Sequence, residues 1–262
     1  NTWYKCKKFI RAKMIIDINI NWGNWPFGNL YFNSFRNYIN KIRNKGIEEG
    51  FISPIDGIFS PDPDIQNEKV IKKLNKQNNF KCIPIINPKL KNWDEILEKY
   101  NKKYKIKIIK IVPSFHRYSI IEKDVYKFFE KLCQLDMSPV IQKRFEDERS
   151  KSPVLNLKDI EIKEIEKISN AFSDLKIIIL CSYRHEVVKL SEKCKNLYFD
   201  ISFIECLDTL ASLLKYIPED RVIFGSNSPF LYPESSIFKL KYSTLTKTQF
   251  DKISYKNLLS LC

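Results

Sequence analysis

Polar side chains alternate along one apolar segment near the start of the chain. The run from Met14 to Trp22 is apolar at first and then carries Asp17, Asn19 and Asn21 at every second position. Successive side chains of a strand point to opposite faces, so a strand here would place the three polar groups on one face. A carboxylate and two amides grouped in this way could bind a substrate or move a proton.

Other polar residues occupy the same kind of position, at or just beyond the end of an apolar segment. Together with the first three they form the set Asp17, Asn19, Asn21, Asn87, His116, Gln142, Arg144, Asp200, Glu205 and Asn227. In a parallel barrel these ends open into one mouth, where active sites are found. We therefore predict a polar site at such a mouth.

Two members of the set could transfer protons, and we predict them as catalytic residues. His116 is the imidazole at a predicted strand end, and Asp17 would act as a base if burial raised its pKa. Structural roles stay open for both. His116 could be hydrogen-bonded within its loop, and Asp17 could hold the ends of the first and last strands together.

The predicted substrate-binding residues are Asn19, Asn21, Lys110, Gln142, Arg144, Glu205 and Asn227. A guanidinium facing inward at Arg144 would bind a carboxylate or phosphate through two hydrogen bonds. It could instead join an ion-pair network with the charged run 146–149. An inward Lys110 would be either reactive or paired, and an outward one would be solvated.

Two further features have alternative interpretations. Cys181 is expected to be a small buried filler, because nothing near it in the sequence marks an activated thiol. The aromatic residues after the first strand could form a lid over the mouth or pack against its rim; they are Trp22, Trp25, Phe27, Tyr31 and Phe32.

Strands and helices are expected to alternate along the whole chain. Strands are predicted at 14–21, 50–54, 80–86, 106–112, 139–144, 176–180, 197–200 and 221–224, and helices at 34–45, 65–77, 93–103, 123–135, 159–172, 184–194, 207–216, 237–245 and 248–261. This order favours a single α/β domain, a (β/α)8 TIM barrel, over a doubly wound sheet. The chain of 262 residues fits the usual barrel length of about 250. The barrel would span 14–262, after a basic N-terminal arm at 1–13.

The two ends of this predicted barrel resemble the amidohydrolase superfamily. The run Ile15-Ile16-Asp17 is similar to its first strand, and the run 221–230 (RVIFGSNSPF) to the end of its eighth. The terminal Asn257-Leu258-Leu259 also matches. The resemblance extends from Asp17 to the last helix. It implies a TIM barrel and a hydrolase of C–N or C–O bonds, or a related lyase.

The resemblance also implies a metal site, but this chain departs from the family at the ligand positions. Asn19 and Asn21 stand where the first strand has histidines, and Asn227 stands where the eighth has the aspartate that activates water. Gln142 and Cys181 stand where the fifth and sixth strands supply histidines. Neutral amides hold divalent transition metals weakly, so we expect no metal and no cofactor.

Net charge and cysteine content indicate the kind of binding partner and the cellular compartment. A net charge of +14 would suggest nucleic acid. However, the lysines are scattered and accompany abundant Asn and Ile, as compositional bias would produce. We expect a small anionic substrate rather than nucleic acid or a membrane, and leave a homodimer open. Seven cysteines without a Cys-x-x-Cys motif indicate reduced thiols in the cytoplasm.

Two functions remain open from the sequence. The first is a metal-independent, amidohydrolase-like enzyme acting on a small carboxylated substrate. Asp17 and His116 would transfer protons, and Arg144 would hold the anionic group. The second is a pseudoenzyme that binds a ligand or protein partner without turnover. Whether any reaction is catalysed is not decided by the sequence.

Overall fold

The computed structural model describes residues 14–30, 34–74, 79–149 and 157–262. Its parallel strands are β1 (Ile16–Trp22), β2 (Glu49–Pro54), β3 (Phe80–Cys82), β4 (Ile108–Ile111), β5 (Ser138–Gln142), β6 (Ile177–Leu180), β7 (Leu197–Asp200) and β8 (Val222–Ile223). They pair in chain order, as a three-stranded sheet from β1 to β3 and a five-stranded sheet from β4 to β8.

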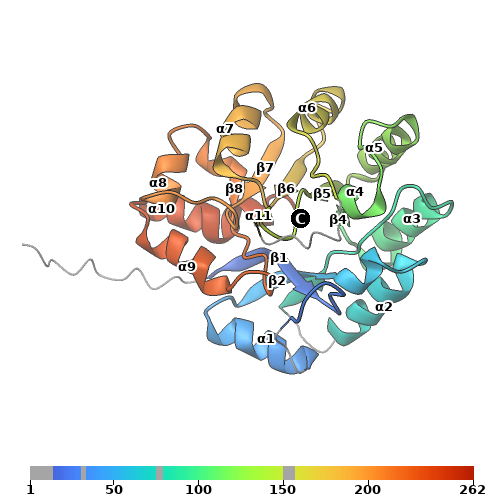
Figure 1. Cartoon of the computed structure of the whole chain (residues 1–262), viewed down its shortest axis with the longest axis horizontal. Helices are drawn as coiled ribbons and strands as arrows, with labels where there is room; N and C mark the ends of the chain where they lie inside the picture. The colour runs from blue at the N-terminus through green and yellow to red at the C-terminus, as the bar shows by residue number, and fades with distance from the viewer. Residues whose placement is uncertain (1–13, 31–33, 75–78, 150–156) are drawn as a thin grey trace, which may run out of the picture.

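Backbone hydrogen bonds join the two sheets at both edges. On one side, the Lys110 N–H donates to the carbonyl of Pro84 over 2.8 Å, and the Ile86 N–H donates to the carbonyl of Lys110 over 2.9 Å. On the other, the Asn21 N–H donates to the carbonyl of Ser228 over 2.7 Å. The strands thus form the predicted barrel, with the helices around it (Figure 1).

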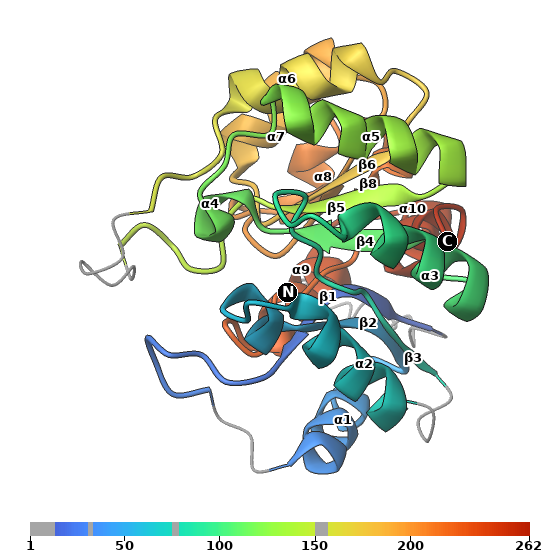
Figure 2. The ribbon, with the colours of Figure 1, turned by 90° about the vertical axis from the view of Figure 1, so that its right-hand side faces the viewer.

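The helices follow the strands and cover the outside of the barrel (Figure 2). They are α1 (Phe35–Asn44), α2 (Pro63–Leu74), α3 (Trp93–Tyr104), α4 (Pro113–His116), α5 (Lys123–Leu135), α6 (Ile162–Ala171), α7 (Arg184–Lys193), α8 (Thr209–Leu213), α9 (Pro233–Tyr242), α10 (Lys247–Asp251) and α11 (Asn257–Leu259). Within the described ranges, none of them has the length and apolar character needed to span a bilayer.

Local sequence explains where these helices begin and what they bury. The Ser34 side chain accepts a hydrogen bond from the Asn37 N–H over 3.2 Å and caps α1. Helix α1 then buries Tyr38, Ile39 and Ile42 at helical spacing. The same pattern places the other helices against the barrel.

Three predicted elements differ from the structure. The strand expected at 80–86 ends at Cys82, since Pro84 has no N–H for a strand ladder. Beyond it, the Asn67 side chain binds the N–H and the carbonyl of Ile85, each over 2.9 Å. A short helix, α4, follows β4 where a loop was expected. The helix expected at 248–261 is divided into α10, a π-helical turn (Lys252–Lys256) and α11. The predicted arm at 1–13 lies outside the described residues.

The core forms two main apolar layers and a smaller cluster at the mouth. The largest cluster packs between the strands and the helices. A second fills the inside of the barrel with Ile16, Ile18, Ile108, Val140 and Ile178. The third surrounds Trp25 at the C-terminal end of the strands. The polar site lies between the second and third clusters.

Candidate active site at the barrel mouth

A group of fully buried polar side chains fills the C-terminal end of the barrel. Asn19 and Asn21 come from β1, and the Asn21 amide donates to Asn19 Oδ1 over 3.5 Å. Asn21 also donates to Asn227 Oδ1 over 3.3 Å, and Asn227 donates to the carbonyl of Phe145 over 2.8 Å. The structure therefore brings together three of the amides that the sequence assigned to the site.

Lys110 from β4 points into this group and is fully buried. Its Nζ donates to Asn21 Oδ1 over 3.3 Å and to Asn19 Oδ1 over 3.5 Å, and it lies 5.9 Å from the centre of the Phe145 ring. Burial lowers the pKa of Lys110 to about 8, against the attraction of Cys181, Asp200 and Asp17. The inward orientation was one of the two alternatives for this residue.

Asp17 does not share the face of Asn19 and Asn21 as strict alternation predicted. The pairing of β1 with β2 is irregular between Asp17 and Ile20. Asp17 Oδ1 accepts from the N–H groups of Asn19 (2.8 Å) and Ser226 (3.0 Å). It thereby ties β1 to the segment after β8, the structural role left open for it. Burial raises the pKa of Asp17 to about 6, and Oδ2 has no hydrogen-bond partner among the described residues.

Asp200, at the end of β7, is a central residue that the sequence placed at the mouth without a catalytic or binding role. Its Oδ2 accepts from the Asn19 amide over 3.0 Å and from the Ser202 hydroxyl over 2.8 Å, and its Oδ1 accepts from the Cys181 N–H over 2.8 Å. Burial raises its pKa. Its position at a strand end was visible in the sequence, but its partners were not.

Cys181 is buried, as expected, but it also has three polar neighbours. Its Sγ accepts hydrogen bonds from the amides of Gln142 (3.2 Å) and Asn19 (3.3 Å) and from the Ser202 hydroxyl (3.5 Å). Burial nevertheless raises the pKa of the thiol to about 12, so it is protonated at neutral pH. The sulfur is therefore an acceptor in the network and not an activated nucleophile.

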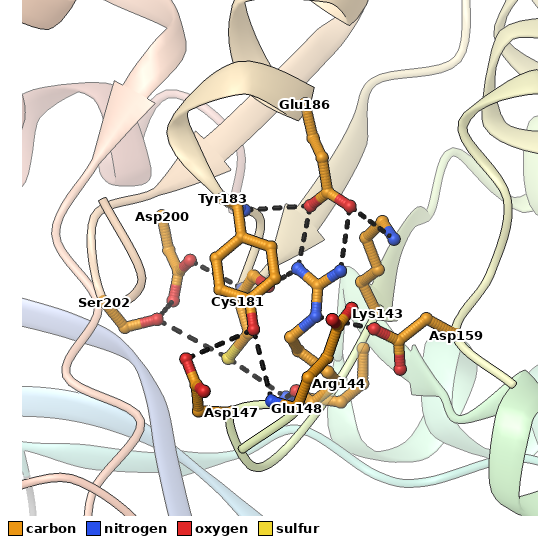
Figure 3. A network of polar contacts seen from close by, with 11 residues as sticks. Lys143, Arg144, Asp147, Glu148, Asp159, Cys181, Tyr183, Glu186, Asp200 and Ser202 are labelled. Atoms are coloured by element: carbon orange, nitrogen blue, oxygen red, sulfur yellow. Dashed lines mark hydrogen bonds and ion pairs between the residues drawn. The ribbon is translucent and has the colours of Figure 1, made fainter. Parts of the chain in front are cut away.

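Arg144 is engaged by carboxylates of the chain itself (Figure 3). It forms two hydrogen bonds with Glu186, of 2.7 and 2.8 Å, and a third with Asp159 of 2.8 Å. Lys143 also pairs with Glu186 over 2.8 Å. Burial alone would raise the pKa of Glu186, but these hydrogen bonds hold it at about 2. Arg144 is therefore part of an ion-pair network, which was one of its two interpretations from the sequence. Its partner Glu186 comes from α7 and not from the run 146–149.

Two other predicted site residues lie outside the polar group. Glu205 is exposed after β7. His116 ends α4, stacks on Tyr118 and has a backbone hydrogen bond with Ile58. Burial lowers the pKa of His116 to about 4, and no contact between described residues joins it to Asp17. The structure therefore does not assemble the predicted proton-transfer pair.

Aromatic side chains close the mouth above the polar group. Trp25 is 3% exposed, and its ring lies 4.8 Å from Phe230 and 5.3 Å from both Phe115 and Phe145, measured between ring centres. A cavity of about 20 Å³ borders Gln142 and Phe145, which is room for about one water molecule. Of the predicted aromatic group, Trp25 covers the mouth, whereas Trp22 packs on α1 and residues 31–33 lie outside the described ranges.

Comparison with known proteins supports the fold. In sequence, the chain matches no family model and no curated protein. In structure, it is similar to 5-carboxyvanillate decarboxylase from Sphingomonas paucimobilis, with a TM-score of 0.75 and 10% identity over 95% of this chain and 98% of that one. It is also similar to dihydroxybenzoic acid decarboxylase from Polaromonas sp. JS666, which holds manganese and 2-nitroresorcinol; the TM-score is 0.72 and the identity 14%, over 95% and 96% of the two chains.

A Staphylococcus aureus protein described as an amidohydrolase has a TM-score of 0.72 and 12% identity, over 95% of this chain and 99% of that one. Identities this low show the shared architecture and nothing finer. The fold is the α/β barrel of these neighbours, so the barrel that the resemblance implied is confirmed at the level of the fold.

The manganese in one neighbour prompts a test of whether this chain fits a divalent cation. Within the described ranges, no group of three or more His, Cys, Asp and Glu side chains could hold one. The oxygens of Asn19 and Asn21 face the ammonium group of Lys110. A divalent ion at these amides would meet weak neutral ligands and be repelled by Lys110. The residues present therefore do not fit manganese or zinc.

Proposed function

We propose that this protein binds a small carboxylated molecule at the barrel mouth and acts on it as a hydrolase or lyase without a metal. The observation that carries the proposal is the position of Lys110. A fully buried ammonium group is held by two amide oxygens rather than by a carboxylate. Since an unpaired buried charge is costly to fold, its retention favours a role in binding an anion.

The chemistry proposed for this site uses the groups around Lys110. A substrate carboxylate would take the position next to its ammonium group, and the amides of Asn19, Asn21 and Asn227 would orient the rest. Asp200, whose pKa is raised by burial and whose Oδ2 contacts the Asn19 amide, would gain or lose the proton at this site. Arg144 is saturated by Glu186 and Asp159, so Lys110 replaces it in the proposal as the anion-binding residue.

The class of substrate is proposed from two observations. Two of the structural neighbours are decarboxylases of hydroxylated benzoates. In this chain, the rings of Trp25, Phe115, Phe145 and Phe230 cover the polar group and would stack on an aromatic acid. Access requires the Trp25 side chain to move, and the substrate ring would take its place. We further propose a cytoplasmic location, which the free thiols of the described cysteines support.

The test is a calorimetric titration with 2,6-dihydroxybenzoate, the acid bound in one neighbour. We expect binding to the wild type, binding about tenfold weaker or less to Lys110→Met, and no change for Lys102→Met, whose side chain is 71% exposed. Metal analysis of the same samples should give substoichiometric manganese and zinc. Equal binding by Lys110→Met, or stoichiometric metal, would overturn the proposal.

A second function is favoured by the closed mouth. With Trp25 buried and about one water's volume beside Gln142, the barrel could bind a ligand or partner without turnover. Turnover assays on wild type and Trp25→Ala separate the two. Binding without product in both variants would establish the pseudoenzyme, whereas product formation by either would establish the enzyme.

A further inference from the structure

The ammonium group of Lys110 has weaker partners than the buried side chains of Lys143 and Arg144. Lys143 and Arg144 pair with Glu186 at 2.8 and 2.7 Å. Lys110, in contrast, has no carboxylate within ion-pair distance among the described residues, and its two amide contacts are 3.3 and 3.5 Å long. An amine that is buried without an ion pair is readily deprotonated, and the neutral form is a nucleophile.

A carboxyl group that could move protons for such a nucleophile lies in the same cluster. Asp200 Oδ2 accepts from the Asn19 amide over 3.0 Å, and Oδ1 of Asn19 contacts Nζ of Lys110. Asp200 is also close enough to Lys110 to influence its ionisation. A carboxylic acid and an amine in one buried cluster are the groups that imine formation from a carbonyl compound requires.

We propose that Lys110 forms an imine with the carbonyl carbon of a β-oxo acid and that the iminium group drives loss of CO2. This rests on the proposed lyase function and extends its substrates from aromatic acids to β-oxo acids, for which Lys110 is the nucleophile instead of the carboxylate-binding group. The amine adds to the carbonyl carbon, and the resulting carbinolamine loses water to give the iminium ion. The bond to the carboxylate carbon then breaks, and its electron pair enters the iminium group to form an enamine.

Protonation of the enamine and hydrolysis of the resulting iminium ion complete the reaction. The enamine carbon takes a proton from Asp200, and one water molecule, equal to the one released, hydrolyses the new iminium ion to a ketone and the free amine and returns a proton to Asp200. The proton that completes the water released on iminium formation comes from solvent, so the sum is β-oxo acid anion plus one proton giving ketone plus CO2. The aromatic residues Trp25, Phe145 and Phe230 exclude water around the carboxylate, and neutral CO2 is favoured over the anion in such surroundings. The iminium cation keeps a positive charge at the position that the ammonium group occupies.

The experiment is trapping with sodium borohydride in the presence of acetoacetate, followed by peptide mass spectrometry. We expect one modified lysine, Lys110, carrying the isopropyl group that results from decarboxylation before reduction. Lys143 serves as the internal control, since it is equally buried but ion-paired. Lys110→Arg keeps the charge and should abolish the adduct, whereas Lys107→Arg should keep it. The same trapping on Trp25→Ala removes the ring that covers the site.

The outcomes separate the two proposals. Absence of the Lys110 adduct in both wild type and Trp25→Ala, or equal labelling of Lys143, overturns the imine. If 2,6-dihydroxybenzoate still binds in a Lys110-dependent manner, the proposed function stands without it. If neither binding nor an adduct is found, both fail.

Discussion

The Nζ atom of Lys110 lies 3.3 Å from Oδ1 of Asn21, so a cation and a neutral amide face each other inside the barrel. This pairing compensates only part of the cost of burying the ammonium group. Its consequence is a fold that is less stable than the same barrel with an apolar side chain at this position.

Lys110→Met is therefore expected to increase the free energy of unfolding by about 1–3 kcal/mol at pH 7. The folded-state pKa of about 8 is below the ordinary lysine pKa of 10.5, so the folded state binds fewer protons between these values. Wild-type stability should thus rise as the pH increases from about 8 to 10.5, and this slope should vanish in the variant. Urea unfolding between pH 7 and 10.5 measures both the gain in free energy of unfolding and the pH slope. A destabilised variant would show that Lys110 stabilises the fold.

Asp17→Asn should remove a different pH dependence. The pKa of Asp17 is raised from 3.8 to about 6, so the stabilisation it provides is full below pH 4 and is lost as the pH rises through 6. The asparagine retains an oxygen for the N–H groups of Asn19 and Ser226. We expect a flatter stability curve between pH 4 and 7, measured by thermal unfolding. An unchanged curve would place the pKa of Asp17 near its ordinary value.

Arg144→Met should cost about 3–5 kcal/mol, because it leaves the buried carboxylate of Glu186 with one of its two basic partners and removes an ion pair with Asp159. Arg149→Met is the matched control, since its ion pair with Asp147 involves a side chain that is 86% exposed. That variant should change the free energy of unfolding by less than about 1 kcal/mol. Chemical denaturation of both variants provides the comparison, and equal effects would contradict the structural role of Arg144.

Gly225→Ala should disturb the position of Asp200. A Cβ atom at Gly225 would lie 2.7 Å from Oδ2 of Asp200 and 2.8 Å from its Cβ, closer than side-chain carbons approach. We expect a loss of about 1–3 kcal/mol, as in other overpacked cores. A Cβ atom at Gly46 would have no heavy atom within 4 Å, but the φ of Gly46 is +97°. Gly46→Ala therefore controls for backbone strain alone. Thermal unfolding should show whether the Gly225 variant loses stability through the crowding of Asp200.

The barrel could be predicted because its signals are local. The apolar periodicity placed α5 at 123–135 and β7 at 197–200, where the structure has them. The predicted strand length was wrong where a side chain takes the place of the hydrogen bonds between strands, as the Asn67 side chain does at the backbone of Ile85. The polar strand ends were recognised for the same local reason, since each follows an apolar run.

Pairings across the barrel could not be predicted in this way. Arg144 and Glu186 are 42 positions apart, and nothing in either segment indicates that the guanidinium is already occupied. Asp200 binds Asn19 across 181 positions, and that contact makes Asp200 central to the site. The aromatic closure over Lys110 likewise depends on four segments, three loops and α4, that meet only in the folded chain.

The two sides of the mouth are fastened by different forces. The side at β5 and α7 is fastened by the ion pairs of Arg144, whereas Trp25 is held by ring contacts and its loop by a hydrogen bond from the Asn24 N–H to Asp56. Apolar contacts weaken on cooling, and buried ion pairs respond little to it. On cooling, the protection of amides against exchange, relative to their intrinsic exchange rates, should therefore fall first around residues 23–30, so that the barrel opens at the Trp25 side while the Arg144 side stays closed.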